Sequence, residues 1–172
     1  MTSRKFFSLF VLCALIPLAA AKLSLELGWF SQAAVNKGQW VEHDIELLPD
    51  VSSTAAAWRL VYLAPKDCAE SCTQVLYSLQ QLYLGLGRKQ LQIQPIIMAP
   101  SKLEQLENYA ALEWSPNNVS QHELHDQIVI VNRDGLALLR YPVPNAIEEM
   151  RNLAQDIRTD LLRLMNYDRS GT

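Results

Sequence analysis

The chain has 172 residues, a formal net charge of −3 and 49% hydrophobic residues, which suits one domain with an apolar core. It contains no basic run and no interleaving of arginine with aromatic residues, so a nucleic acid is not an expected partner. The sequence also has no internal repeat and no low-complexity segment.

The N-terminal segment predicts export. Arg4 and Lys5 precede an apolar, uncharged block over residues 6–21. Apolar character continues to Trp29, which favours a retained transmembrane anchor with Trp29 at the membrane interface. One alternative is a signal peptide cleaved after the small residues Ala19–Ala21, which form an A-x-A pattern, and another is a buried core helix. In either case the positive charges keep the N-terminus in the cytoplasm, and the rest of the chain is expected outside it.

We expect four segments along the chain. Residues 1–29 form the anchor, and residues 30–55 form a polar tether that leads to a short edge strand. One folded domain over residues 56–167 and a tail over 168–172 follow.

The first elements of the folded domain follow from hydrophobic periodicity. Residues 57–63, AWRLVYL, alternate and are rich in aromatic and β-branched residues, so they predict a strand that ends before Pro65. A helix is expected over about 69–84, because apolar residues recur every three or four positions until two glycines stop it. Residues 91–99, LQIQPIIMA, predict a buried strand.

The second half predicts a helix, a hairpin and a final helix. Ser101 and Glu104 form a capping box, which predicts a helix to about residue 112 with a loop after it. Residues 127–142, QIVIVNRDGLALLRYP, predict a hairpin that turns at the Asp-Gly pair. An amphipathic helix is expected over 145–165. Two parallel strands joined by a helix, then a hairpin, predict an α/β sheet covered by helices on both faces.

Cys68 and Cys72 are the strongest chemical signal. They follow the first buried strand and lie at the start of the next helix, where functional sites of α/β sheets gather and where the helix dipole favours a thiolate. At a spacing of four, both sulfurs can bond to each other or hold one soft cation. The pair is therefore a redox couple, a metal clamp or two buried thiols. Cys13, in the apolar block, is read as a small hydrophobic residue.

These features together resemble a known family. The strand, the proline-containing loop, the CxxxC at a helix start, the DG hairpin and the closing helix resemble the thioredoxin-like fold. CxxxC rather than CxxC resembles its Sco (Sco/SenC) branch, membrane-anchored proteins that help to insert copper into cytochrome c oxidase. LGWF followed by NKGQ is also similar to small membrane-tethered proteins of proteobacterial oxidase assembly clusters.

The resemblance implies a three-layer thioredoxin-like domain behind one transmembrane helix, in the inner membrane with the domain facing the periplasm. It implies a copper site formed by Cys68, Cys72 and a distant histidine. The implied partner is a cytochrome c oxidase subunit or another assembly factor.

The chain also departs from the family pattern. Members usually carry a proline after each cysteine, where this sequence has Ala69 and Thr73. His125 precedes the hairpin strand one residue short of the usual ligand spacing, and His122 is two residues too far. His125 is therefore the candidate third ligand, and the alternative is a solvated loop histidine beside Asp126.

Three functions remain open from the sequence. The first is copper delivery by Cys68, Cys72 and His125. The second is a thiol–disulfide reductase in which Cys68 attacks and Cys72 resolves. The third is a non-catalytic assembly partner that uses the fold only for docking.

Overall fold

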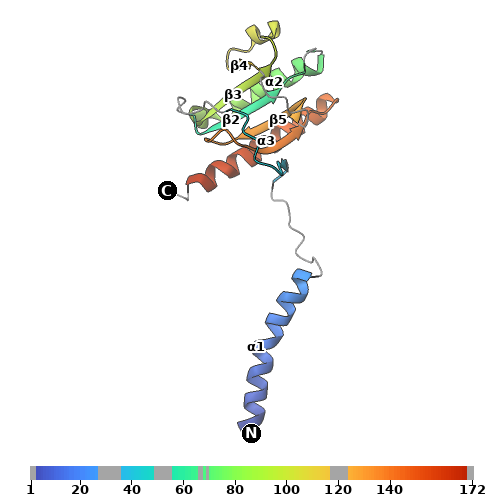
Figure 1. The fold of residues 1–172 in the computed structure, drawn as a ribbon, viewed down its shortest axis with the longest axis vertical. Coiled ribbons are helices and arrows are strands. Elements are labelled where there is room, and N and C mark those ends of the chain that lie inside the picture. Colours follow the sequence, from blue (N-terminus) through green and yellow to red (C-terminus); the bar gives the residue numbers. More distant parts are fainter. Residues whose placement is uncertain are drawn as a thin grey trace. The chain divides into compact units, whose positions relative to one another are not determined.

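The structure is a computed structural model of the whole chain (Figure 1). By their internal contacts the residues form two units, Met1–Val35 and Asn36–Thr172, each of which is described by itself. The structure describes residues 3–26, 36–48, 56–65, 68, 70–116 and 124–169.

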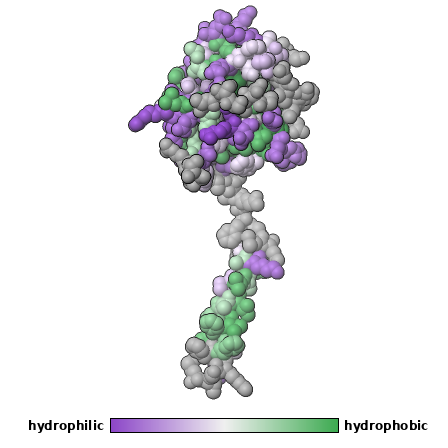
Figure 2. Space-filling model, turned by 60° about the vertical axis from the view of Figure 1, so that its left-hand side comes forward, coloured by the Kyte–Doolittle hydropathy of each residue, from purple (hydrophilic) through white to green (hydrophobic). Residues whose placement is uncertain are grey.

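The described part of the first unit is one helix, α1 (Ser3–Glu26). Its stretch Phe7–Ser24 is long and apolar enough to cross a membrane, and none of it is buried against protein. The surface of this helix is coloured mostly as hydrophobic in Figure 2. Eighteen helical residues extend over about 27 Å, close to the thickness of a bilayer's hydrocarbon core. An N-terminal apolar helix that can anchor the chain is therefore confirmed.

The second unit is built on a six-stranded mixed sheet in the order β1-β6-β5-β2-β3-β4. β2 pairs in parallel with β3, and β3 in parallel with β4, while the other neighbours are antiparallel. Every residue of the central strand β2 is buried, as its apolar and aromatic composition predicts. The strands are β1 (Gln39–Trp40), β2 (Trp58–Leu63), β3 (Ile93–Ala99), β4 (Glu113–Pro116), β5 (Gln127–Val131) and β6 (Ala137–Pro142).

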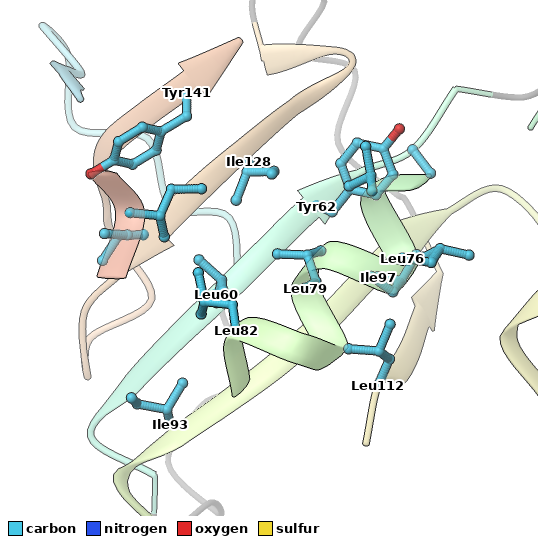
Figure 3. Packing of buried hydrophobic residues seen from close by; sticks show 14 of the residues in the cluster. Leu60, Tyr62, Leu76, Leu79, Leu82, Ile93, Ile97, Leu112, Ile128 and Tyr141 are labelled. Carbon is cyan, nitrogen blue, oxygen red and sulfur yellow. The ribbon is translucent and has the colours of Figure 1, made fainter. Parts of the chain in front are cut away.

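The helix α2 (Glu70–Gly85) connects β2 to β3, with a 3₁₀ helix η1 (Gly87–Gln92) after it. Its buried residues recur at three- and four-residue steps and pack on Leu60 and Tyr62 of β2, as Figure 3 shows. The apolar period of the sequence thus predicts both the helix and the face that it buries. These buried residues are Cys72, Val75, Leu76, Leu79 and Leu82.

The last helix, α3 (Ile147–Arg169), lies beside α2 on the same face of the sheet. The opposite face carries a second apolar cluster, and the segment with Ile45 and Leu47, together with Leu124, covers it. Helices were expected on both faces, whereas in the described residues a non-helical segment forms the second outer layer. The residues of α3 in the first cluster are Met150, Ile157, Leu161 and Met165.

The helix expected over residues 101–112 is wrong. The chain forms only a short 3₁₀ helix, η2 (Glu104–Asn108), which has no side-chain cap, and then the strand β4 where a loop was expected. Leu103 and Leu106 are both buried, and their three-residue spacing suits a 3₁₀ turn. Because β4 pairs in parallel with β3, the chain must return across the sheet within residues 100–112.

A tether that leads to a short edge strand was expected over residues 30–55. The structure has a short edge strand there, β1, but residues 36–48 belong to the folded unit rather than to a tether. The Val41 N–H donates to the Leu138 carbonyl (3.0 Å), and the Ala137 N–H donates to the Ile45 carbonyl (2.9 Å). Leu47 is only 1% exposed. The stretch is polar on average, so its composition predicted a tether. Its few apolar residues, however, cover the second face of the sheet.

A buried carboxylate fixes the start of this segment. Asp160 of α3 is fully buried and accepts hydrogen bonds from the Lys37 N–H (2.7 Å), the Gly38 N–H (2.9 Å) and the Tyr141 hydroxyl (2.8 Å). Arg163 lies 3.7 Å from its other oxygen. Asp160 therefore joins α3, β6 and the approach to β1.

Candidate redox site

The two cysteines lie where β2 ends and α2 begins. The β2–β3 ladder continues one residue beyond β2, because the Ala64 N–H donates to the Met98 carbonyl (2.9 Å). Cys68 follows that ladder, and Cys72 is the third residue of α2. The sequence predicted this position, at the carboxyl end of a parallel strand, where functional groups of α/β sheets gather.

Cys68 and Cys72 form a disulfide, with their Cα atoms 5.2 Å apart. Cys72 is 1% exposed and belongs to the main apolar cluster, whereas Cys68 is half-buried at its edge. A disulfide offers no thiolate to a metal ion, so only the reduced pair can act as a soft ligand. The two sulfurs thus differ in access, with Cys68 the one that a large partner can reach.

The start of α2 supplies a favourable field for a reduced cysteine. The first N–H groups of a helix lack partners within the helix, and the dipole places partial positive charge there. A thiolate on Cys68 or Cys72 is stabilised by both effects. Glu70, exposed in the first turn, faces the same dipole.

A second pair of residues borders this edge of the sheet. The Tyr62 hydroxyl donates to Oδ1 of Asp126 (2.9 Å), which lies directly before β5. The Asp126 N–H donates to the Leu63 carbonyl (3.0 Å), and its own carbonyl accepts from the Val143 N–H (3.3 Å). Three hydrogen bonds therefore fix Asp126 against the end of β2 and hold it at a positive φ of 54°.

Burial raises the pKa of Tyr62 well above its ordinary value, and the negative charge and hydrogen bond of Asp126 raise it further. Sequence reasoning did not find this pair. Its two members are 64 positions apart, and nothing in either local stretch signals the other.

His125 adjoins Asp126 and is exposed at the same edge of the sheet. Within the described residues no group of three or more His, Cys, Asp and Glu side chains is arranged to hold a metal ion. The role of His125 as a third ligand stays a prediction. His122 and Ala69 lie outside the described residues.

A mixed sheet with a CxxxC disulfide at the start of its first crossover helix defines a thioredoxin-like protein. Residues 58–165 match the family described as "Transmembrane-like, thioredoxin-like, C-terminal domain". The chain belongs to this family. The thioredoxin-like fold expected from the sequence is confirmed.

One solved structure supports this fold, and two further similar structures are reported with it. The chain is similar to apo Sco1 from Thermus thermophilus, with 13% identity, 76% of this chain and 97% of that chain covered, and a TM-score of 0.53. ScoI with copper bound, from Bradyrhizobium japonicum, has 13% identity over 59% of this chain and 85% of that chain, with a TM-score of 0.40. A thiol:disulfide interchange protein, DsbE, from Chlorobium tepidum has 15% identity over 71% and 95%, with a TM-score of 0.44.

At 13% identity the Thermus protein supports a common fold and no transfer of function. No curated protein matches the sequence. Function must therefore be argued from the residues of this site.

Proposed function

We propose that the chain is a membrane-anchored thiol–disulfide exchange protein that acts outside the cytoplasm. The observation that carries this proposal is the Cys68–Cys72 disulfide at the start of α2, with one half-buried and one buried sulfur. An attacking thiol must be reachable by a protein disulfide, whereas a resolving thiol needs only to reach its neighbour.

The exchange conserves electrons. The Cys68 thiolate attacks one sulfur of a client disulfide, and the other client sulfur leaves as a thiolate. The Cys72 thiolate then attacks Cys68, so the second client sulfur leaves and the Cys68–Cys72 disulfide forms. Two electrons pass to the client, and an extracytoplasmic dithiol protein must reduce the pair again. The resemblance to Sco proteins favours the copper-site cysteines of a cytochrome c oxidase subunit as the client.

Trapping experiments test the assignment of roles. In the full chain, Cys13 is first replaced by Ser, because it is an exposed free thiol in α1. Adding Cys72→Ser should accumulate a mixed disulfide with a disulfide-bonded client peptide, while Cys68→Ser should not. In the reduced protein, Cys68 should react with iodoacetamide faster than Cys72, with an apparent pKa below the free value of about 8.5.

Absence of any trapped adduct, with both thiols titrating near the free value, would contradict an exchange role. If oxidase activity in cells were unaffected by replacing both cysteines, a docking role alone would remain.

A second candidate function is copper carriage by the same reduced pair. Two thiols four residues apart, one before α2 and one in its first turn, with Cα atoms 5.2 Å apart, suit a soft cation such as Cu(I). His125 lies at the same edge of the sheet, before β5, and is our proposed third ligand. Copper is then a cargo passed to an oxidase subunit.

Copper binding is measured separately from exchange, by titrating reduced Cys13→Ser protein with Cu(I) against a competing chelator. We expect one ion per chain, lost in the Cys68→Ser, Cys72→Ser variant and weakened by His125→Ala. If His125→Ala binds Cu(I) as tightly as the parent, His125 is not a copper ligand. If the reduced parent binds no Cu(I), the protein does not carry copper.

A further inference from the structure

An open cavity of about 700 Å³ lies between α2 and α3. One wall extends along α2 from Glu70 to Gly85, and the other along α3 from Ile147 to Arg158. The ring of Tyr109 adds to the lining, and its hydroxyl donates to the Thr73 carbonyl (3.5 Å). We call this feature the α2–α3 groove.

The α2–α3 groove begins at the first turn of α2, the turn that contains Cys72. Glu70 and Thr73, both in its lining, flank Cys72 along α2. α3 starts at the same end of the sheet, because the Val143 N–H donates to Asp126, shortly before α3 begins. From there the groove follows α2 for about 22 Å, at 1.5 Å per helical residue.

Most of the surface that lines the groove is apolar, and its two basic side chains both come from α3. Tyr77 and Ile147 are 59% and 64% exposed and both line this groove, so they offer apolar surface to a partner. Arg151 and Arg158 lie two turns apart on α3, and neither forms an ion pair with a described residue. The single acidic side chain of the lining, Glu70, lies at the disulfide end.

These walls suit a helix rather than an extended peptide. A β-type extended segment binds by pairing its backbone N–H and C=O groups with a sheet edge, whereas the backbone groups of α2 and α3, apart from those of the terminal turns, are bonded within each helix. A helical partner satisfies its own backbone and needs only an apolar stripe. Carboxylates seven residues apart on its flank would meet Arg151 and Arg158.

Two helical occupants from this chain fit poorly. α1 carries no carboxylate before Glu26, so it cannot supply two acids to the arginines. If two copies packed groove to groove, Arg151 and Arg158 of one copy would face Arg151 and Arg158 of the other. Like charges would then oppose each other across the contact.

We propose that the α2–α3 groove binds an amphipathic, acidic-flanked helix of the redox client and so brings a client cysteine to Cys68. This inference rests on the proposed thiol–disulfide function, because it assigns a partner to the same site. Docking raises the effective concentration of the client sulfur beside Cys68, and the exchange becomes faster without any change in the cysteines.

The test uses the full chain in zwitterionic lipid nanodiscs and a fluorescent helical peptide of about 18 residues, which is about five turns long. The peptide carries leucines at helical spacing and two glutamates seven positions apart, and a matched peptide carries lysines in their place. Anisotropy should show the glutamate peptide binding about tenfold tighter than the lysine peptide, with a preference that salt weakens.

Arg151→Glu with Arg158→Glu should reverse the preference between the two peptides. Arg88→Glu, an exposed charge change outside the groove, should leave it unchanged. Ile147→Ser should weaken both peptides, at little cost to folding because the side chain is exposed.

Equal binding of both peptides, or a preference that survives the double arginine change, would overturn the proposal. So would sedimentation showing a dimer that the double change dissociates, because a second copy would then fill the groove. Exchange with a small disulfide separates the two proposals: Cys68→Ser should abolish exchange yet retain peptide binding. A protein that exchanges but binds neither peptide would keep the proposed function and lose the docking site.

Discussion

Two tyrosines show how the hydrogen bond of a single side chain can join two elements of this domain. Tyr62 donates to Asp126 and Tyr141 donates to Asp160, and each bond joins elements that are distant in sequence. The first fixes the start of β5 beside the end of β2, where Cys68 follows. The second holds β6 against α3. Both hydroxyls are buried, so each must keep its proton and its acceptor.

The two tyrosines predict a loss of stability at alkaline pH. Burial raises the pKa of both Tyr62 and Tyr141, and the neighbouring carboxylates raise each further. The folded pKa therefore exceeds the unfolded value of about 10, so this stability is complete below that pH and falls as the pH rises above it. Urea unfolding from neutral pH upward should show the free energy of unfolding declining beyond about pH 10.

Paired phenylalanine variants check the cause. Tyr62→Phe with Tyr141→Phe should be less stable at neutral pH but should show a shallower alkaline decline. Tyr77→Phe is the control, because Tyr77 is 59% exposed and should keep the parent's slope. The same alkaline slope in the double variant and the parent would assign the decline to other groups.

Gly38 predicts a different kind of sensitivity. A Cβ added there would overlap the ring of Tyr141, and that ring cannot swing aside without losing the bond to Asp160. We expect Gly38→Ala to destabilise the domain by about 1–3 kcal/mol, as overpacking does.

Gly85→Ala is the matched control for Gly38, because nothing lies within 4 Å of the added Cβ. It should be neutral or slightly stabilising, since alanine favours the helix. Thermal melts of both variants give the comparison, and a Gly38→Ala protein that melts with the parent would show that the Tyr141 ring is not fixed.

At the scale of elements, the sequence correctly predicted the helices and strands whose buried residues recur with a regular period within the element itself. The helix expected over 69–84 is α2 (Glu70–Gly85), and the hairpin over 127–142 is β5 and β6, with Gly135 at a positive φ of 84° in the turn. The final amphipathic helix is α3. In each case the period of apolar residues, or the turn residue, contains the decisive information.

Elements whose form depends on distant partners were missed. β4 alternates poorly and is mostly exposed, so only its pairing with β3 makes it a strand. The capping box at Ser101 favours a helix locally, but the chain has to return to the sheet by Glu113. The same distinction applies to the candidate site. The two cysteines are four positions apart and could be recognised in the sequence, whereas the Tyr62–Asp126 hydrogen bond joins residues 64 positions apart and could not.

At the scale of the whole molecule, the hydrogen bonds of residues 36–48 within the folded unit shorten the stretch of chain that connects this unit to α1. A tether was expected within residues 30–55, but at most residues 27–35 lie between α1 and the first described residue of the domain, Asn36. Ten peptide units can span no more than about 35 Å even when fully extended. A retained anchor would therefore keep Cys68 close to the membrane and to any membrane-embedded client.

Whether α1 remains attached can be tested through the small residues near its end. We expect the full chain to resist carbonate extraction and to keep its N-terminus, because Phe7–Ser24 is apolar enough to span and apolar residues continue beyond the possible cleavage site. Ala19→Leu with Ala21→Leu removes the A-x-A pattern while keeping the helix apolar. If the anchor is retained, this variant and the parent will have the same size and the same membrane fraction. The contrary result is a soluble parent that begins at Lys22 together with a membrane-bound variant. In that case the N-terminal helix is a cleaved signal, and Cys68 belongs to a freely diffusing domain.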